Sequence, residues 1–342
     1  MTTIYDVAHE AGVSIGTVSY VINNKGSIGP QTTQRVQQAI QKLNYNPRGA
    51  AQALARGCTN TVLLVAPLNI YEYQMSMILI IESIGQAITN SDYRLFIHPT
   101  LNRPDAWREL EADVGRRQMD GVILMHVQQN DPRVELLRHT KIPFVLIGRC
   151  ENLDGIYFVD ADIEAAVHLG VQHLYDLGHR TIGMLDENTE GGPEAHITRA
   201  LRDGFHLSLE SLNLEYKPEW CLHLSRGPAS ASQDILQMLA APDHPTALFA
   251  MSDAMVMNAY SAAHTLHYKI PEDLAIIGYA DSPLYPSLNP PCSAVFDSIP
   301  MIGRIATEML LTLLYGEEPE CKQLLIPPHL VARSSTQPEL IK

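Results

Sequence analysis

The side chains with the greatest capacity for chemistry, fourteen histidines and five cysteines, are scattered along the 342 residues. The cysteines show no C-x-x-C spacing, so neither a disulfide framework nor a zinc site is predicted. No H-E-x-x-H motif and no supported pair of acidic residues indicates catalysis. No G-x-G-x-x-G or G-x-x-x-x-G-K-[ST] motif follows an apolar run. We therefore predict a protein that is not an enzyme and that holds no metal or cofactor.

Length and composition indicate a globular chain of about two domains with a smaller appendage. Hydrophobic residues make up 46% and charged residues 18% of the sequence, which excludes a disordered or fibrous protein. The longest apolar runs, such as 77–81, fall far short of the roughly 20 residues of a membrane span. The N-terminus shows no signal-peptide pattern, so we expect a cytoplasmic protein with no membrane partner.

Charge is distributed unevenly between the start of the chain and the rest. Residues 1–60 carry a net charge of +3, whereas the whole chain carries −14, which leaves −17 for the remainder. The charged residues of that first segment are Lys25, Arg35, Lys42, Arg48 and Arg56 against Asp6 and Glu10. A basic segment on an acidic body is typical of a local contact with a polyanion, although a difference of this size also arises by chance.

Three short helices are predicted within residues 1–46. Thr3 is placed to cap the first helix, with Asp6 three residues later. Gly12 suits a sharp turn, because glycine adopts positive φ without penalty. Ser14 is placed to cap the second helix, and a third runs over about 31–44. The positions expected to face the core are Val7, Ala8, Ala11, Val18, Val21, Ile22, Val36, Ile40 and Leu43. This pattern predicts a helix-turn-helix unit.

The motifs in this region narrow that prediction to one family. The chain reads T-I-Y-D-V-A over 3–8, A-G-V-S over 11–14 and T-V-S over 17–19, followed by Asn23. N-Y-N-P over 44–47 and A-Q-A-L-A over 51–55 continue the match. The chain closely resembles the LacI/GalR family of repressors, first over its DNA-binding head and hinge and then, more loosely, over its whole length. The resemblance implies a transcription regulator, expected to be a repressor, that binds a near-palindromic double-stranded operator.

The resemblance places the second helix in the major groove, with Ile15, Gly16 and Tyr20 at the base edges. Many family members have polar or large readers at the first two positions and arginine at the third. Ile15 offers only apolar contact, Gly16 only its backbone and Tyr20 one hydroxyl, so the half-site is expected to differ. Groups placed to contact phosphates are Thr3, Tyr5, Ser14, Thr17, Ser19, Asn23 and Thr32. Tyr45 is a further expected DNA contact. For Ser14 and Thr17, plain helix capping is an equal alternative.

The hinge segment contains the sharpest single prediction. In the family, the residue corresponding to Leu54 is a wedge that enters the minor groove and kinks the duplex. The alternative is a linker leucine that packs on the body. Ala51 and Ala55 leave room for two hinge helices to approach each other, and Arg48 is expected to face phosphates. The hinge is expected to be helical only on DNA.

Beyond residue 59 the pattern changes to alternating strands and helices. Short apolar runs at 62–66, 121–125, 144–147, 181–185, 247–250 and 274–278 are typical of buried strands. Helical stretches at 73–90, 105–117, 162–177, 195–212, 229–241 and 253–266 separate them. This alternation predicts an α/β body with parallel sheets, and ligands bind at the carboxyl ends of such strands.

The order of these segments resembles the periplasmic sugar-binding proteins and the regulators built on them, with two lobes and a cleft between them. The predicted domains are a helix-turn-helix head over 1–46, a hinge over 47–58 and an effector-binding, dimerising body over 59–342. The first lobe is expected to span about 59–160 and 293–322, and the second about 161–292 and 323–342.

Residues of the cleft follow from the resemblance one by one. Arg199 precedes G-F at 204–205, where the family places an arginine that binds the effector; the alternative is a surface arginine. Tyr71 and Tyr73 would offer an aromatic face to a sugar ring, or pack in their loop. Arg149 would line the cleft or brace it. Trp220 and His223 lie near the place of a stacking aromatic residue, with an alignment that is uncertain there.

Two departures affect the effector prediction. Ser252 and Ala280 replace side chains that commonly hold a sugar hydroxyl in the family, and Ala280 forms no side-chain hydrogen bond. Asp253 is expected to cap the helix that follows it, as is Asp281, which is also a candidate effector contact. The predicted effector is a small, sugar-like molecule, with a non-sugar metabolite or a protein co-regulator as alternatives. A ligand-binding protein without a DNA role is a further alternative, which the N-terminal head opposes.

The expected assembly is a homodimer. The chain after Thr336 is too short for the extra heptad helix with which some members form tetramers. Met75, Ile78 and Leu79 are candidate interface residues, with the core of the lobe as the alternative place for them.

Overall fold

The computed structural model describes residues 2–22, 28–45, 58–67, 74–100, 107–116, 118–187, 195–224, 228–296 and 298–337. The chain divides into two compact units, Met1–Thr61 and Val62–Lys342, which we call the head and the body. Within the described residues, no helix has both the length and the apolar character needed to cross a membrane.

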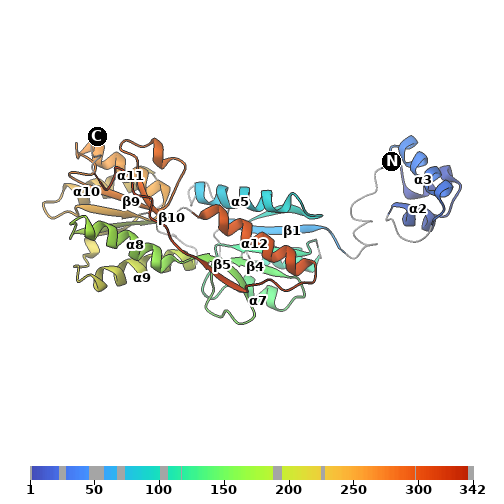
Figure 1. The fold of residues 1–342 in the computed structure, drawn as a ribbon, viewed down its shortest axis with the longest axis horizontal. Helices are drawn as coiled ribbons and strands as arrows, with labels where there is room; N and C mark the ends of the chain where they lie inside the picture. The colour runs from blue at the N-terminus through green and yellow to red at the C-terminus, as the bar shows by residue number, and fades with distance from the viewer. Residues whose placement is uncertain are drawn as a thin grey trace. The chain divides into compact units, whose positions relative to one another are not determined.

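The described residues of the head form three helices (Figure 1). They are α1 (Ile4–Ala11), α2 (Ile15–Ile22) and α3 (Pro30–Lys42). A capping box begins α1, because Thr3 and Asp6 each accept the other's backbone N–H. Gly12 ends α1 in the left-handed conformation, with φ 63°. The Ser14 hydroxyl accepts the backbone N–H of Thr17 at 3.1 Å and so begins α2. The predicted helix-turn-helix is therefore confirmed.

The core of the head is small and entirely apolar. Val7, Val18 and Val36, one from each helix, are fully buried, and alanine side chains of α1 and α3 fill the space between them. Four of the positions predicted to face inward are only partly buried at the edge of this core: Val21, Ile22, Ile40 and Leu43.

The first sheet of the body has six strands in the order β11-β5-β4-β3-β1-β2. The pairs β1–β3, β3–β4, β4–β5 and β5–β11 are parallel. Its strands are β1 (Thr61–Pro67), β2 (Arg94–Thr100), β3 (Gly121–Met125), β4 (Phe144–Ile147), β5 (Tyr157–Ala161) and β11 (Gln323–Ile326). Its helices are α5 (Gln74–Ile88), α6 (Trp107–Gly115), α7 (Pro132–Arg138) and α12 (Ile299–Leu314).

The second sheet has five parallel strands in the order β10-β9-β8-β6-β7. Its strands are β6 (Ile182–Glu187), β7 (Cys221–Leu224), β8 (Ala247–Ala250), β9 (Ala275–Ala280) and β10 (Ser293–Phe296). Its helices are α8 (Ile163–Asp176), α9 (His196–Ser211), α10 (Pro228–Ala240) and α11 (Asp253–Thr265). The predicted two-lobed α/β architecture is confirmed, with one sheet in each lobe (Figure 1).

Two of the predicted lobe boundaries are wrong by a few residues. Strand β10 pairs with β9 in the second sheet, so the second lobe extends to Phe296 instead of ending at 292. Strand β11 pairs with β5 in the first sheet, so the first lobe extends to Ile326 instead of ending at 322. Backbone pairing fixes these crossings, and the short strands β10 and β11 were not predicted from the sequence.

Helices α5 and α12 lie side by side in the first lobe (Figure 1). Gly303 permits their close approach, because a Cβ there would lie 2.1 Å from Ser83 Oγ and 2.6 Å from the Ile80 carbonyl oxygen. Ser83 in turn donates its hydroxyl to the Ile80 carbonyl at 2.8 Å. The contact fixes the spacing of two helices that reach the region between the lobes.

Candidate functional site

The predicted base-facing residues of the head are exposed. Ile15 and Tyr20 on α2 are 39% and 53% exposed, and Gly16 is exposed between them. A Cβ at Gly16 would meet only Ser14 Oγ, at 3.6 Å, which is ordinary contact. The fold therefore does not require glycine at this position. An exposed isoleucine and an exposed tyrosine on a short helix leave apolar surface that the head itself does not cover.

The candidate phosphate contacts of the head fall into three groups. Thr3, Tyr5 and Ser14 are exposed, although Thr3 and Ser14 also cap helices. Thr17, Ser19, Thr32 and Tyr45 are only partly exposed, and Tyr45 packs against the core of the head. The remaining predictions, Asn23, Arg48, Ala51, Leu54 and Ala55, lie outside the described residues, as does most of the predicted hinge.

The body contains a cavity of about 120 Å³ between its two lobes. In the first lobe, the walls come from α5, α12 and the carboxyl ends of three neighbouring strands. These residues are Ser76, Met77, Ile80, Met125, His126, Val127, Ile147, Gly148, Asp160, Ala161, Ile299 and Ile302. The carboxyl ends of parallel strands lie along one edge of a sheet, where ligands of α/β proteins bind.

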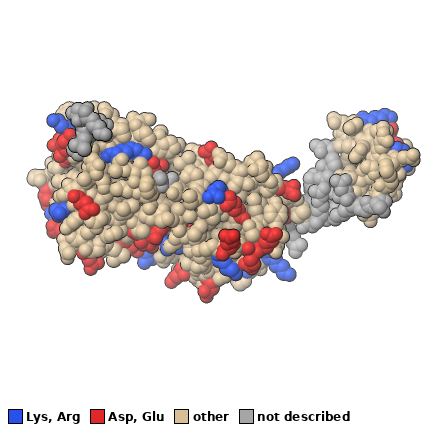
Figure 2. Space-filling view, in the orientation of Figure 1, with Lys and Arg blue, Asp and Glu red and all other residues tan. Residues whose placement is uncertain are grey.

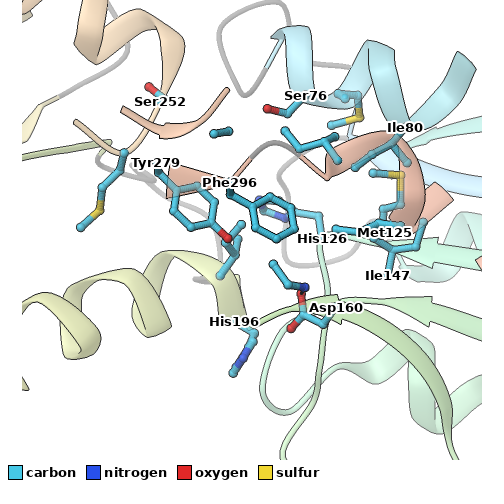
Figure 3. Close-up of a pocket in the computed structure, with 18 of the residues that line it drawn as sticks. Ser76, Ile80, Met125, His126, Ile147, Asp160, His196, Ser252, Tyr279 and Phe296 are labelled. Carbon is cyan, nitrogen blue, oxygen red and sulfur yellow. Dashed lines mark hydrogen bonds between the residues drawn. The ribbon is translucent and has the colours of Figure 1, made fainter. Parts of the chain in front are cut away.

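The second lobe closes the cavity with the carboxyl ends of its own strands (Figure 3). Its residues are His196, Ile197, Met251, Ser252, Asp253, Tyr279, Ala280 and Phe296. The rings of Tyr279 and Phe296 are nearly parallel, with 5° between their planes and 6.1 Å between their centroids. Both residues line that side of the cavity as a stacked pair.

Burial controls the charge of the ionisable groups in the walls. Burial, together with the positive charge of Arg133, lowers the pKa of His126 to about 4, so this imidazole is neutral at pH 7. Burial raises the pKa of Asp160 to about 6, against the opposing effect of Arg149. Burial also raises the pKa of Asp253. The described lining of the cavity contains no lysine or arginine.

Two of the predicted effector residues, Ser252 and Ala280, line the cavity. The hydroxyl of Ser252 also caps α11, because it accepts the backbone N–H of Met255 at 3.3 Å. The prediction that Asp253 caps this helix is therefore wrong, since Asp253 is its first residue. Binding of an effector by Ser252 and Ala280 remains a prediction.

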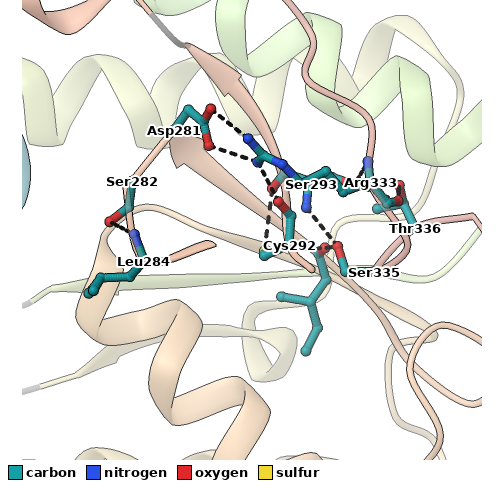
Figure 4. Close-up of polar contacts among 9 residues, drawn as sticks. Asp281, Ser282, Leu284, Cys292, Ser293, Arg333, Ser335 and Thr336 are labelled. Carbon is teal, nitrogen blue, oxygen red and sulfur yellow. Dashed lines mark hydrogen bonds and ion pairs between the residues drawn. The ribbon is translucent and has the colours of Figure 1, made fainter. Parts of the chain in front are cut away.

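Asp281 does not line the cavity and does not cap a helix; it is held by Arg333 (Figure 4). The Arg333 guanidinium donates to both carboxylate oxygens of Asp281, at 2.7 and 2.8 Å, and to the Cys292 carbonyl at 2.6 Å. Ser335 donates to the Ile276 carbonyl of β9 at 2.6 Å. These contacts fasten the C-terminal segment to the second sheet.

The two predicted arginines do not line the cavity. Arg149 donates to Asp160 at 2.9 Å and to Glu164 of α8 at 3.0 Å, so it braces the two lobes, which was one of its two predicted roles. The side chain of Arg199 is 54% exposed and contacts Gln129 at 3.1 Å and Asp203 at 3.5 Å. On this part of α9 the side chain that points into the core is Leu201, which is fully buried.

The remaining predicted effector residues lie elsewhere or outside the described residues. Trp220 is buried in the core of the second lobe and donates to the Asp243 carbonyl at 3.1 Å. His223 contacts Asp186 at 3.2 Å from strand β7 and does not line the cavity. Tyr71 and Tyr73 lie outside the described residues. Trp220 thus belongs to the core and is not a stacking residue of the cavity.

One rim of the cavity is closed by backbone contacts between the lobes. Gln128 and Ala195 form an isolated antiparallel bridge, and the His196 N–H donates to the Val127 carbonyl at 2.8 Å. The loop after β3 is thereby joined to the start of α9. These backbone contacts join the two lobes beside the cavity.

Sequence reasoning missed most of the cavity lining. His126 directly follows the predicted strand 121–125, and Tyr279 lies just beyond the predicted strand 274–278. The rule that ligands bind at carboxyl ends of strands identifies both. Asp160 and Phe296 belong to β5 and β10. Neither strand was predicted, so no comparable signal identifies these two residues.

The surface of the body is mixed in charge and predominantly acidic. On the face drawn in Figure 2, acidic side chains are spread over the body and basic ones are scattered among them. This agrees with the net charge of −17 that remains beyond residue 60 and gives the body no evident affinity for a polyanion.

Comparison with protein families and curated relatives gives consistent results. The lacI family of bacterial regulatory proteins matches residues 3–48, and the periplasmic binding protein-like domain matches residues 171–336. The HTH-type transcriptional repressor PurR of Mannheimia succiniciproducens is 30% identical over 98% of this chain and 99% of its own length. PurR of Proteus mirabilis is 30% identical over 98% of this chain and 97% of its own length.

Solved structures also resemble the whole chain. A complex of the transcriptional regulator CelR with cellobiose is 26% identical, with a TM-score of 0.72 over 98% of this chain and 100% of that one. A lac repressor dimer bound to operator and an anti-inducer shares the fold, with a TM-score of 0.84 and 24% identity over 98% of this chain and 99% of that one.

Proposed function

Since the chain belongs to the LacI family of bacterial regulatory proteins and is a DNA-binding transcriptional repressor, we propose that it reads a near-palindromic operator as a cytoplasmic homodimer. Its affinity for that operator is set by a small molecule bound between the two lobes of the body. The observation that carries this proposal is the head, in which α2 exposes Ile15, Gly16 and Tyr20 beside a well-capped turn.

The proposed dimer uses the exposed side of α5. Ile78 is 54% exposed on this helix, and Leu79 is partly buried beside it. Met77 and Ile80 of the same helix line the cavity, so a dimer contact on α5 lies one residue from the ligand site. Movement of α5 on ligand binding would then change the contact between protomers, and this change would alter the arrangement of the paired heads.

The proposed switch is a change in the angle between the lobes. Contacts such as Arg149–Glu164 and the Gln128–Ala195 bridge join the lobes in the described state. A ligand with different affinities for two lobe arrangements shifts the population between them. The hinge helices, which are proposed to fold only on DNA, transmit that shift as a gain or loss of operator affinity.

The experiment that tests the proposal is selection of operator duplexes from a random pool with the full chain, followed by Leu54→Ala. If Leu54 is a minor-groove wedge, the variant should bind the selected duplex much more weakly, because the kink is no longer stabilised. Its stabilisation by a ligand of the body should not change. Equal operator binding by the parent and by Leu54→Ala contradicts the wedge, and failure to select any duplex contradicts the proposed function.

The ligand expected from the resemblance is a carbohydrate, and the CelR complex with cellobiose is a relative with such a ligand. Other relatives carry the name PurR. Ala280 lines the cavity without a hydrogen-bonding group, and the Ser252 hydroxyl already caps α11. Both departures from the family leave the usual sugar contacts incomplete.

A further inference from the structure

The described lining of the interlobe cavity is mostly aliphatic, thioether or aromatic. Methionine side chains enter it from three elements, as Met77 on α5, Met125 at the end of β3 and Met251 after β8. Ile80, Ile299 and Ile302 add an aliphatic wall from α5 and α12. Such walls gain from contact with apolar surface and offer nothing to a hydroxyl group.

An anionic ligand has no counter-charge in this lining. Arg149, which donates to the lining residue Asp160 at 2.9 Å, is also bonded to Glu164 at 3.0 Å. The acidic groups at the cavity itself, Asp160 and Asp253, repel a carboxylate or a phosphate. Burial of an unpaired anion between these walls is strongly unfavourable.

A hydroxyl-rich ligand would meet mostly apolar surface in the described lining. A free monosaccharide carries several hydroxyl groups, and each one buried without a partner costs about 1–3 kcal/mol. The Ser252 hydroxyl accepts the Met255 N–H, and Ala280 offers no side-chain donor or acceptor. The other polar side chains of the described lining are outnumbered by the apolar and aromatic ones; they are Ser76, His126, Asp160, His196 and Asp253.

A flat, uncharged ring fits the lining, because it needs neither a counter-charge nor many hydrogen-bond partners. Tyr279 and Phe296 line one side of the cavity as a stacked pair with 5° between their rings, against which a further aromatic ring packs favourably. Methionine sulfur atoms also pack well against aromatic edges. The cavity of about 120 Å³ has room for one small ring. An apolar cavity of about 150 Å³ in another protein binds benzene.

We propose that the effector of this protein is an uncharged, mostly apolar aromatic compound, bound against Tyr279 and Phe296, and not a free sugar or an anion. The inference rests on the proposed function, because it names the ligand class of the same interlobe site. The neutral His126 and the serine hydroxyls at the edge leave room for one or two polar groups on the ring.

The test uses the full chain and three matched probes at equal concentrations: indole, benzoate and glucose. Indole is flat and uncharged, benzoate is flat and anionic, and glucose is uncharged and rich in hydroxyl groups. Indole should raise the midpoint of thermal unfolding by a few degrees, whereas benzoate and glucose should not. The inference is overturned if indole gives no shift, or if benzoate or glucose gives the larger one.

Ala280→Met places a longer side chain in the cavity and tests where indole binds. Its affinity for indole should fall roughly tenfold or more, because the methionine takes the space of the ring. Ala254→Met, at an exposed position on α11 outside the cavity, is the matched control and should bind indole as the parent does. Equal affinity of Ala280→Met and the parent overturns the assignment.

Operator binding is measured on the same preparations with the selected duplex. A chain that binds operator and shows no response to indole contradicts this inference and leaves the proposed function standing. A chain that binds indole at the cavity and selects no duplex contradicts the proposed function instead. Operator affinity that changes with indole supports both.

Discussion

At the residue scale, several side chains that were candidates for effector binding instead have a structural role. Trp220 is buried in the second lobe, and Asp281 is held by Arg333. Gly16 is the opposite case. It is the second residue of α2 and has room for a Cβ, so nothing in the fold explains a residue that weakens a helix.

Replacement of Gly16 by alanine separates the two roles. Alanine in a helix interior is favoured over glycine by about 1 kcal/mol, so Gly16→Ala should stabilise the head by up to that amount. Operator affinity should fall, because the added methyl group lies where the backbone is proposed to approach the bases. Thermal unfolding and duplex binding measure the two effects. Unchanged duplex affinity would show that Gly16 does not lie against the DNA.

Gly115→Ala is the control for this prediction. Gly115 is exposed at the end of α6, and a Cβ there would meet nothing within 4 Å. This change in the body should leave operator affinity as it is in the parent. An effect of equal size from both glycines would point to a general change in the protein and not to contact at α2.

The residue scale also shows how far the sequence predicts the site. Ser252 and Ala280 were found through the family resemblance, as departures from its usual side chains, and they lie just after β8 and at the end of β9, strands with clear apolar runs. His126 follows such a strand too, and its position alone identifies it. Arg199 was placed by its spacing from a motif, and the helix turns that position outward. A spacing error of one or two residues on a helix moves a side chain to another face.

At the element scale, strongly periodic segments were predicted well and short strands were not. The helices over 163–176 and 253–265 agree with their predictions within a residue or two. Strand β2 has a mostly exposed pattern, and β10 and β11 have four residues each. Such strands carry little hydrophobic signal of their own, because their pairing with neighbours defines them.

The contact between α5 and α12 yields a prediction at this scale. Gly303→Ala should destabilise the body by about 1–3 kcal/mol, because its Cβ would overlap Ser83 Oγ and the Ile80 carbonyl oxygen. The helices must then separate, and the affinity for indole should fall, since both helices line the cavity. Denaturant unfolding and indole titration measure the two effects.

Gly85→Ala on α5 is the matched control, because a Cβ at Gly85 would meet nothing within 4 Å. This variant should be as stable as the parent or slightly more stable. If Gly303→Ala proved equally neutral, the close approach of the two helices would not limit the stability of the body or the shape of the cavity.

At the scale of the whole molecule, the contacts between the two lobes beside the cavity, which we call the seam, link ligand binding, charge and stability. The same strand ends that line the cavity also supply the contacts that join the lobes, such as the Val127 carbonyl and the His196 N–H. His126 lies beside Val127 and is buried in its neutral form. The stability of the body is therefore expected to depend on pH through a residue of the seam.

The sign of this dependence follows from the lowered pKa of His126. Its ordinary value is 6.5 and its value in the fold is about 4, so between these limits the unfolded chain binds a proton that the folded chain does not. The free energy of unfolding therefore has its full value, as far as His126 is concerned, above pH 6.5, and it decreases as the pH falls towards 4. The total decrease from this residue is about 3 kcal/mol at most.

His126→Asn should remove that dependence. Asparagine suits the position because the backbone there has φ 53°, a conformation that asparagine adopts readily. The variant should be less stable than the parent at pH 7, because a buried ring is lost, but the difference between them should shrink as the pH falls from 6.5 towards 4. Asp160, whose pKa is raised, acts in the opposite direction in both proteins and so leaves their difference unaffected.

Urea unfolding of the parent, of His126→Asn and of the exposed control His168→Gln at pH 7 and pH 5 measures the effect. A constant difference between His126→Asn and the parent would show that His126 titrates alike in the folded and unfolded chain.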